Sequence, residues 1–179
     1  IEAGLLRRDD LLAMIEAREI EAEPESATLA EWRARARGGA GGVAVAAARA
    51  LGAPEPEALR PLGAAYGVAG LLRSTPFLAA HGRCLLPAEL LAAQDLSVEA
   101  AVAAPDSPAV RAVLAQLVDE GRAWLRQGLI APPRGSAIAA ALPAVLARRD
   151  LTRWPAMAPA RRGVGDRVAV AIAGLRGRL

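Results

Sequence analysis

The 179-residue sequence contains no lysine and no asparagine, and it has only one cysteine, one histidine and one phenylalanine. All 22 basic residues are arginines. We interpret this bias as the mark of a GC-rich bacterial genome and not as a functional signal. The single cysteine, Cys84, excludes an internal disulfide and fits a reducing compartment. Because Cys84 lies in an apolar run, we favour a buried structural thiol over a nucleophile.

Aromatic residues make up only 3% of the chain, and the arginines are interleaved with carboxylates over most of its length. Nucleic-acid binding favours a basic stripe with stacking aromatic side chains. We therefore expect no nucleic-acid partner. No uncharged apolar stretch reaches about 18 residues, the length that spans a bilayer. We expect a cytoplasmic protein, either soluble or in peripheral contact with the inner face of a membrane.

The residues that are abundant favour an all-α fold. Apolar residues make up 54% of the chain, mostly Ala and Leu, and β-branched residues are few. Helical spacing predicts a bundle of six to eight helices without strands. The expected segments are 5–22, 28–51, 57–72 or as far as 80, 87–93, 97–103, 106–128, 136–149 with a kink at Pro143, and 166–176. We divide the chain into a helical domain, 1–155, and a basic helix or tail, 156–179.

Local signals mark several of these boundaries. Thr28 and Glu31 form the pattern of a capping box, and Ser97 and either Asp106 or Ser107 are suited to cap later helices. A cluster of glycines at 38, 39, 41 and 42 interrupts the helix that begins at Thr28. Such a cluster indicates either a close approach of another helix or the wall of a ligand site.

The C-terminal part is basic. From residue 148 onward the acidic side chains are Asp150 and Asp166. The same part contains eight arginines: Arg148, Arg149, Arg153, Arg161, Arg162, Arg167, Arg176 and Arg178. A solvated face is the favoured interpretation. Contact with anionic lipid or an acidic partner is the alternative.

The stretch from 63 to 87, GAAYGVAGLLRSTPFLAAHGRCLLP, is the most specific in the chain. It resembles the second signature of the squalene/phytoene synthase superfamily, which in catalytic members reads N-I-L-R-D-x-x-x-D, followed by G-R-x-Y-L-P. The Leu71-Leu72-Arg73 core and the Gly-Arg…Leu-Pro tail are present here. The two aspartate positions are occupied by Ser74 and Leu78.

The resemblance implies an isoprenoid-synthase-type helical bundle, incomplete at its N-terminus. Catalytic members join two prenyl diphosphates with Mg²⁺ held by two Asp-rich motifs, since hard cations prefer oxygen ligands. The first motif is expected upstream of residue 1. The Leu-Arg-x-Thr-Pro-Phe form of the second resembles the branch that contains the mitochondrial complex I assembly factor with a phytoene-synthase-like domain. The resemblance therefore implies a non-catalytic member, which needs no cofactor.

Other candidate sites in the sequence are weak. Asp9 and Asp10 are adjacent, so their side chains diverge on a helix. Glu16 and Glu19 have the i,i+3 spacing that can hold a cation, but Arg18 lies between them and the central helix offers no partner carboxylate. His81 has no nucleophile motif around it, so we interpret it as a turn residue.

Our leading hypothesis is a bundle with an apolar cavity that binds an isoprenoid or other lipid, or that acts in the assembly of a protein complex. The alternative is an Mg²⁺-dependent prenyltransferase whose first motif lies upstream, and a scaffold without a cavity is a third candidate. Arg73 and Arg83 can contact an anion or form helix-end salt bridges, and Phe77 and Leu78 are expected to make the charged end of the cavity apolar. No catalytic or metal-binding residue is predicted, and the candidate ligand-binding residues are Glu16, Glu19, Gly67, Gly70, Leu71, Arg73, Ser74, Phe77, Leu78 and Arg83.

Overall fold

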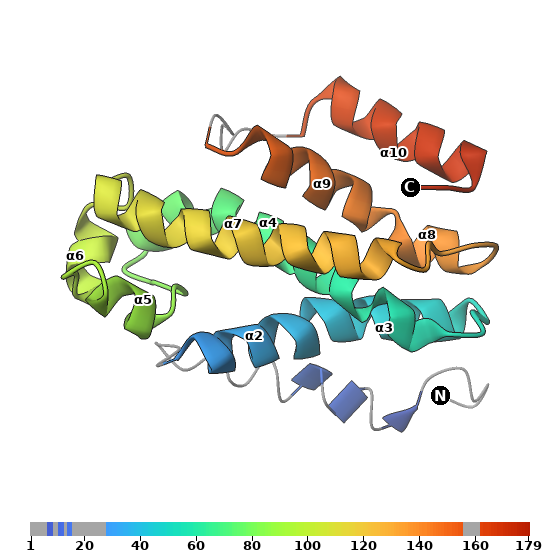
Figure 1. Ribbon diagram of the computed structural model, residues 1–179, viewed down its shortest axis with the longest axis horizontal. Coiled ribbons are helices and arrows are strands. Elements are labelled where there is room, and N and C mark those ends of the chain that lie inside the picture. Colours follow the sequence, from blue (N-terminus) through green and yellow to red (C-terminus); the bar gives the residue numbers. More distant parts are fainter. Residues whose placement is uncertain (1–6, 9–10, 13, 16–27, 156–161) are drawn as a thin grey trace.

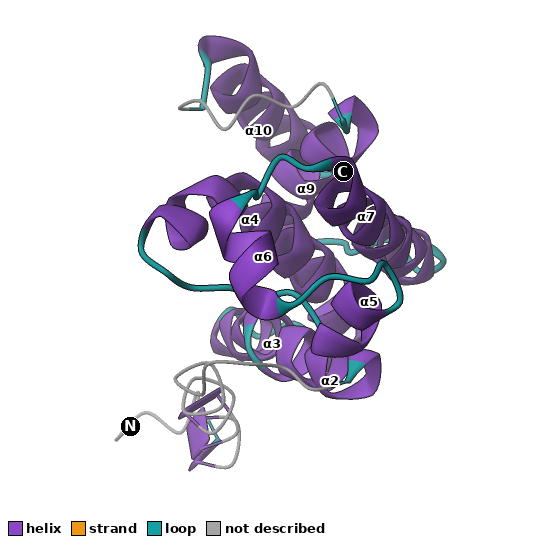
Figure 2. Ribbon diagram, turned by 90° about the vertical axis from the view of Figure 1, so that its left-hand side faces the viewer, coloured by secondary structure: helices purple, strands orange, loops and turns teal. Residues whose placement is uncertain are grey.

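The computed structural model describes residues 7–8, 11–12, 14–15, 28–155 and 162–179. Within these residues the chain is all-α, with no β-strand (Figures 1 and 2). Its helices are α2 (Leu29–Gly38), α3 (Ala40–Ala50), the 3-10 helix η1 (Pro56–Leu59), α4 (Arg60–Ala80), α5 (Ala88–Ala92), α6 (Val98–Ala103), α7 (Pro108–Leu129), α8 (Ala137–Ala141), α9 (Pro143–Arg153) and α10 (Val164–Arg176). The predicted fold class is confirmed.

The predicted helix caps at Thr28, Ser97 and Ser107 are confirmed. The Thr28 hydroxyl accepts a hydrogen bond from the Glu31 amide at 3.1 Å, and the Glu31 carboxylate accepts one from the Thr28 amide at 3.1 Å. Ser97 caps α6 by accepting from the Ala100 amide, and Ser107, not Asp106, caps α7. The predicted helix over 5–22 lies mostly outside the described residues.

The expected number of helices was too low, since the described residues alone form nine α-helices and one 3-10 helix. Two predicted helices are each divided in two. Gly39, with ψ of −92°, leaves the helical conformation between α2 and α3. Pro143 lacks an N–H and begins a new helix, so that α8 ends at Ala141 and α9 extends to Arg153.

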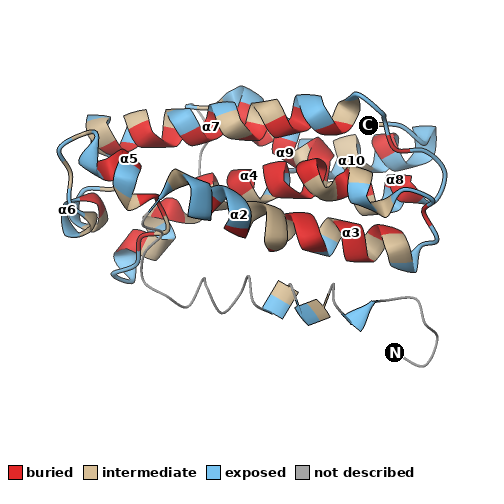
Figure 3. Ribbon diagram, turned by 60° about the horizontal axis from the view of Figure 1, so that its bottom comes forward, coloured by how far each residue is buried: buried red, intermediate tan, exposed pale blue. Residues whose placement is uncertain are grey.

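Helix α4 lies at the centre of the bundle and packs against α3, α7 and α9 (Figure 1). It continues past Pro76 to Ala80. Small and apolar residues such as Ala64, Ala65 and Val68 are completely buried along it, as expected for a helix surrounded by others. Figure 3 shows the buried residues running along α3, α4 and α7.

Glycines allow α3 and α4 to approach each other closely. A Cβ atom on Gly63 would lie 2.5 Å from the Ala40 carbonyl oxygen, and one on Gly41 would lie 2.9 Å from the Arg60 carbonyl oxygen. Real Cβ atoms do not approach backbone so closely. At Gly41 the glycine cluster therefore serves helix packing, one of the two interpretations that the sequence left open.

Helix α10 packs against α9 at one side of the bundle (Figure 1).

The described residues include no helix with the length and apolar character needed to cross a bilayer. The division of the chain at residue 155 stays a prediction.

Candidate functional site

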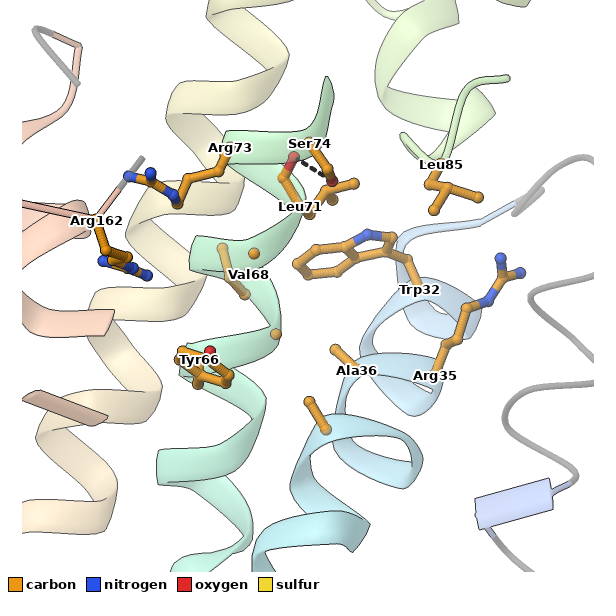
Figure 4. A pocket seen from close by; sticks show the side chains of 13 residues that line it. Trp32, Arg35, Ala36, Tyr66, Val68, Leu71, Arg73, Ser74, Leu85 and Arg162 are labelled. Atoms are coloured by element: carbon orange, nitrogen blue, oxygen red, sulfur yellow. Dashed lines mark hydrogen bonds between the residues drawn. The ribbon is translucent and has the colours of Figure 1, made fainter. Parts of the chain in front are cut away.

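A cavity of about 560 Å³ lies between α2 and α4. Its wall combines aromatic and aliphatic side chains with a few polar ones (Figure 4). The lining residues are Trp32, Arg35, Ala36, Ala40, Tyr66, Gly67, Val68, Gly70, Leu71, Arg73, Ser74, Leu85 and Arg162. Within the described part of the chain, no Asp or Glu lines this cavity.

Two glycines of α4 have different roles at this cavity. A Cβ on Gly67 would lie 2.8 Å from the Ala40 Cβ, so Gly67 allows α4 to approach the start of α3. Among the described residues, a Cβ on Gly70 would meet no heavy atom within 4 Å. The absence of a side chain at Gly70 therefore leaves open space in the cavity, next to Leu71.

The aromatic wall is fixed by a stack between helices. The rings of Trp32 on α2 and Trp124 on α7 are nearly parallel, with centroids 5.9 Å apart and an interplanar angle of 12°. Both side chains are buried. This contact holds Trp32 between the core and the cavity, and such pairs contribute about 0.5–1.5 kcal/mol beyond the burial of their area.

At the other side of α4, Arg73 and Arg162 line the cavity and share the buried carboxylate of Asp150 on α9. The terminal nitrogens of Arg162 lie 2.9 and 2.7 Å from the two Asp150 oxygens, and Arg73 lies 3.5 Å from one of them. A buried carboxylate requires such partners because desolvation disfavours an isolated charge. Ser74 donates its hydroxyl hydrogen bond to the Leu71 carbonyl oxygen at 3.2 Å.

A second carboxylate fastens α10 to α9. Asp166 accepts a hydrogen bond from Arg149 at 2.7 Å and another from Arg153 at 3.2 Å. The hydrogen bond from Arg149, together with the positive charges of Arg149, Arg153 and Arg162, holds the pKa of Asp166 below its ordinary value of 3.8. Arg149, Arg153 and Arg162, three arginines of the basic C-terminal part, are therefore engaged in ion pairs.

The structure places the predicted site residues in three groups. Gly67, Gly70, Leu71, Arg73 and Ser74 line the cavity. Glu16 and Glu19 lie outside the described residues. The remaining three, Phe77, Leu78 and Arg83, do not line the cavity.

Phe77 and Leu78, which we expected in the cavity wall, are not among the residues that line this cavity. Phe77 is 65% exposed, and its ring packs on His81, the residue at the end of α4, with centroids 4.3 Å apart. Leu78 is half-buried one turn beyond Ser74, where the cavity has ended. Arg83 is exposed in the turn that follows the helix.

Five further lining residues were not predicted from the sequence: Trp32, Arg35, Tyr66, Leu85 and Arg162. Trp32 and Arg35 follow the capping box with the spacing of one helical turn, which places them on neighbouring parts of one face. This spacing was the only sequence feature that indicated a shared position for Trp32 and Arg35 on α2. Arg162 carried none, because its position depends on the fold of the chain around Asp150.

The described residues do not fit a Mg²⁺ site of the Asp-rich kind. No cluster of three or more His, Cys, Asp or Glu side chains suited to a metal ion occurs among them. Ser74, at one of the two expected aspartate positions, uses its hydroxyl within its own helix. The other position, Leu78, has an aliphatic side chain outside the cavity.

The family model for squalene/phytoene synthase matches residues 2–159. The chain belongs to this family. In three dimensions, this squalene/phytoene synthase family member is similar to the squalene synthase HpnC from Alicyclobacillus acidocaldarius, with a TM-score of 0.63 and 20% sequence identity. The similarity covers 96% of this chain and 61% of that chain. This structural similarity confirms the isoprenoid-synthase-type bundle. No curated protein matches the sequence significantly.

Proposed function

We propose that this member of the squalene/phytoene synthase family binds an isoprenoid or another lipid in the cavity between α2 and α4, without Mg²⁺-dependent condensation of prenyl diphosphates. The observation that carries the proposal is the composition of the cavity wall. Apolar side chains lie beside arginines, and the described wall has no carboxylate. This composition suits an apolar chain better than a divalent cation.

The size of the cavity supports this function. A volume of about 560 Å³ falls within the range of roughly 300–1,000 Å³ that is usual for small-molecule sites. Burial of apolar surface contributes about 25 cal/mol per Å², which amounts to several kcal/mol for a long prenyl chain. Lipid binding therefore requires no metal ion.

The direct test is incubation of the full-length protein with farnesyl or geranylgeranyl diphosphate, in Mg²⁺ and in EDTA. We expect the same rise in melting temperature in both conditions and no release of pyrophosphate. Mg²⁺-dependent turnover would instead establish the alternative, a prenyltransferase that uses aspartates upstream of residue 1. No rise in either condition would exclude lipid binding and leave only a scaffold role.

The surface of α10 favours a second candidate function, contact with an anionic lipid surface. Val164, Val168, Ile172 and Leu175 are exposed and share one stripe of the helix, opposite the buried Ala173. Exposed arginines flank the stripe, and the nearby carboxylates of α9 and α10 are buried in ion pairs. An apolar stripe bordered by positive charge suits an anionic membrane surface.

This second function is tested by cosedimentation with vesicles. We expect the protein to bind vesicles that contain phosphatidylglycerol and not vesicles of phosphatidylcholine alone. Leu175→Ser should weaken the binding, whereas Ile130→Ser, at an exposed apolar residue beyond α7, should not. If the protein binds neither type of vesicle, the exposed apolar stripe of α10 would instead be assigned to contact with a protein-assembly partner.

A further inference from the structure

Arg35 differs from the other arginines of α2. Its side chain lines the cavity and is only 9% exposed. Its Nε atom and one terminal nitrogen are buried and have no hydrogen-bond acceptor among the described residues. By contrast, Arg33 pairs with Glu120, and Arg37 lies 3.5 Å from the side-chain oxygen of Gln127.

A buried guanidinium without an acceptor is energetically unfavourable. The group has lost its hydration, and an unmade hydrogen bond to a charged group costs more than one between neutral groups. The planar fork of an arginine matches the two oxygens of a carboxylate or phosphate group. An anion at this point of the cavity would therefore recover hydrogen bonds that the protein alone does not provide.

The other two arginines of the cavity are in a different situation. Arg73 and Arg162 both pair with the carboxylate of Asp150, so each has an anionic partner within the protein. Figure 4 shows these two arginines on one side of α4 and Arg35 on the opposite side, on α2. On one side of the cavity the two arginines thus share a carboxylate, whereas Arg35 on the other side has no partner carboxylate among the described residues.

We propose that Arg35 binds the anionic group, a carboxylate or a phosphate, of the ligand whose apolar chain occupies the cavity. The proposal rests on the proposed lipid-binding function and specifies the ligand class as an anionic amphiphile held without metal. Its apolar part lies against Leu71 and the open space at Gly70.

The test compares ligands that share a chain but differ in their head group. Farnesol, farnesoic acid and farnesyl monophosphate are titrated in EDTA against the full-length protein, Arg35→Gln and the control Arg126→Gln. Arg126 is an exposed arginine of α7 that does not line the cavity. We expect the wild type and the control to bind at least one anionic ligand about 10- to 100-fold more tightly than farnesol, and Arg35→Gln to lose this preference.

The outcomes separate this proposal from the function on which it rests. Equal affinity for farnesol and both anions would overturn the role of Arg35 but retain lipid binding. An anion preference that survives in Arg35→Gln and disappears in Arg73→Gln would also overturn it, by placing the head group on the other side of α4. If none of the three ligands binds, the lipid-binding function itself fails.

A measurement without ligand provides an independent check. If Arg35 has no acceptor within the protein, Arg35→Met removes an uncompensated buried charge, and the melting temperature should stay the same or rise. A clear fall would contradict an uncompensated charge at Arg35 and would overturn the proposal. Circular dichroism establishes that the variant is folded.

Discussion

Arg162 and Asp150 form an ion pair through both carboxylate oxygens, at 2.9 and 2.7 Å, beside the cavity. Asp150 is completely buried on α9, and Arg73 reaches it from α4. One carboxylate therefore connects the central helix, α9 and the segment that leads into α10. The two carboxylates Asp150 and Asp166 engage four of the arginines in this region.

Replacing Asp150 should strongly destabilise the protein. Asp150→Asn removes the buried negative charge, so that Arg73 and Arg162 lose their anionic partner. Removing one partner of a buried ion pair costs about 3–5 kcal/mol. Urea unfolding measures this loss. The matched control is Asp119→Asn, whose side chain is 76% exposed and pairs with Arg122 on the same helix, and its cost should stay within about 0.5 kcal/mol. Similar costs for the two variants would contradict the role given to Asp150.

Two glycines of α4 should respond in opposite ways to the same substitution. Gly63→Ala places a Cβ against the backbone of α3, and overpacking of this kind costs about 1–3 kcal/mol. Gly70→Ala places it in open space, and alanine favours a helix over glycine by about 0.5–1 kcal/mol. We expect the free energy of unfolding to fall in the first variant and to rise in the second. A loss in both would mean that α4 has no open space at Gly70.

A large side chain at position 70 should block the cavity. Gly70→Leu fills the space beside Leu71, so the rise in melting temperature caused by a long-chain isoprenoid should disappear. Gly70→Ala is the control that keeps most of this space. EDTA should not change the response of the wild type. A ligand response that vanishes in EDTA would reveal a metal site.

Protonation of Asp166 should loosen α10. The folded-state pKa is lowered, so the stabilisation is complete above the unfolded pKa near 3.8 and is lost as the pH falls through the folded value. Between pH 6 and pH 3, the wild type should therefore lose more stability than Asp166→Asn, which lacks the titrating group. Urea midpoints at several pH values measure the difference. If stability falls equally with pH in the two proteins, the hydrogen bond from Arg149 does not lower the pKa of Asp166.

The sequence predicted features that depend on local chemistry. Thr28 with Glu31, Ser97 and Ser107 bind the nearest amides of their own helices, so the chain around them suffices for the prediction. Pro143 was recognised as an interruption for the same reason. The family was recognised from the stretch around Leu71 and Arg73, and the family match confirms it.

Features that depend on distant segments were missed. The burial of Arg35 arises from packing around α2, and the pairing of Asp150 with Arg162 depends on how the chain returns to α9. The sequence also does not specify where along α4 the cavity ends, and the lining residues of α4 extend only to Ser74. The aspartate positions of a motif indicate where metal ligands are missing, but they do not show which side chains form the wall instead.

The stack of Trp32 on Trp124 also gives the cavity an optical reporter. The chain has three tryptophans, and only Trp32 lines the cavity, with Trp124 in contact with it. Excitation at the red edge of the indole band avoids the single tyrosine, and Trp154→Phe removes the third tryptophan, so that the remaining emission comes from this pair. A ligand that enters the cavity should change the emission intensity and wavelength of this pair, so its affinity can be read from intrinsic fluorescence without any label.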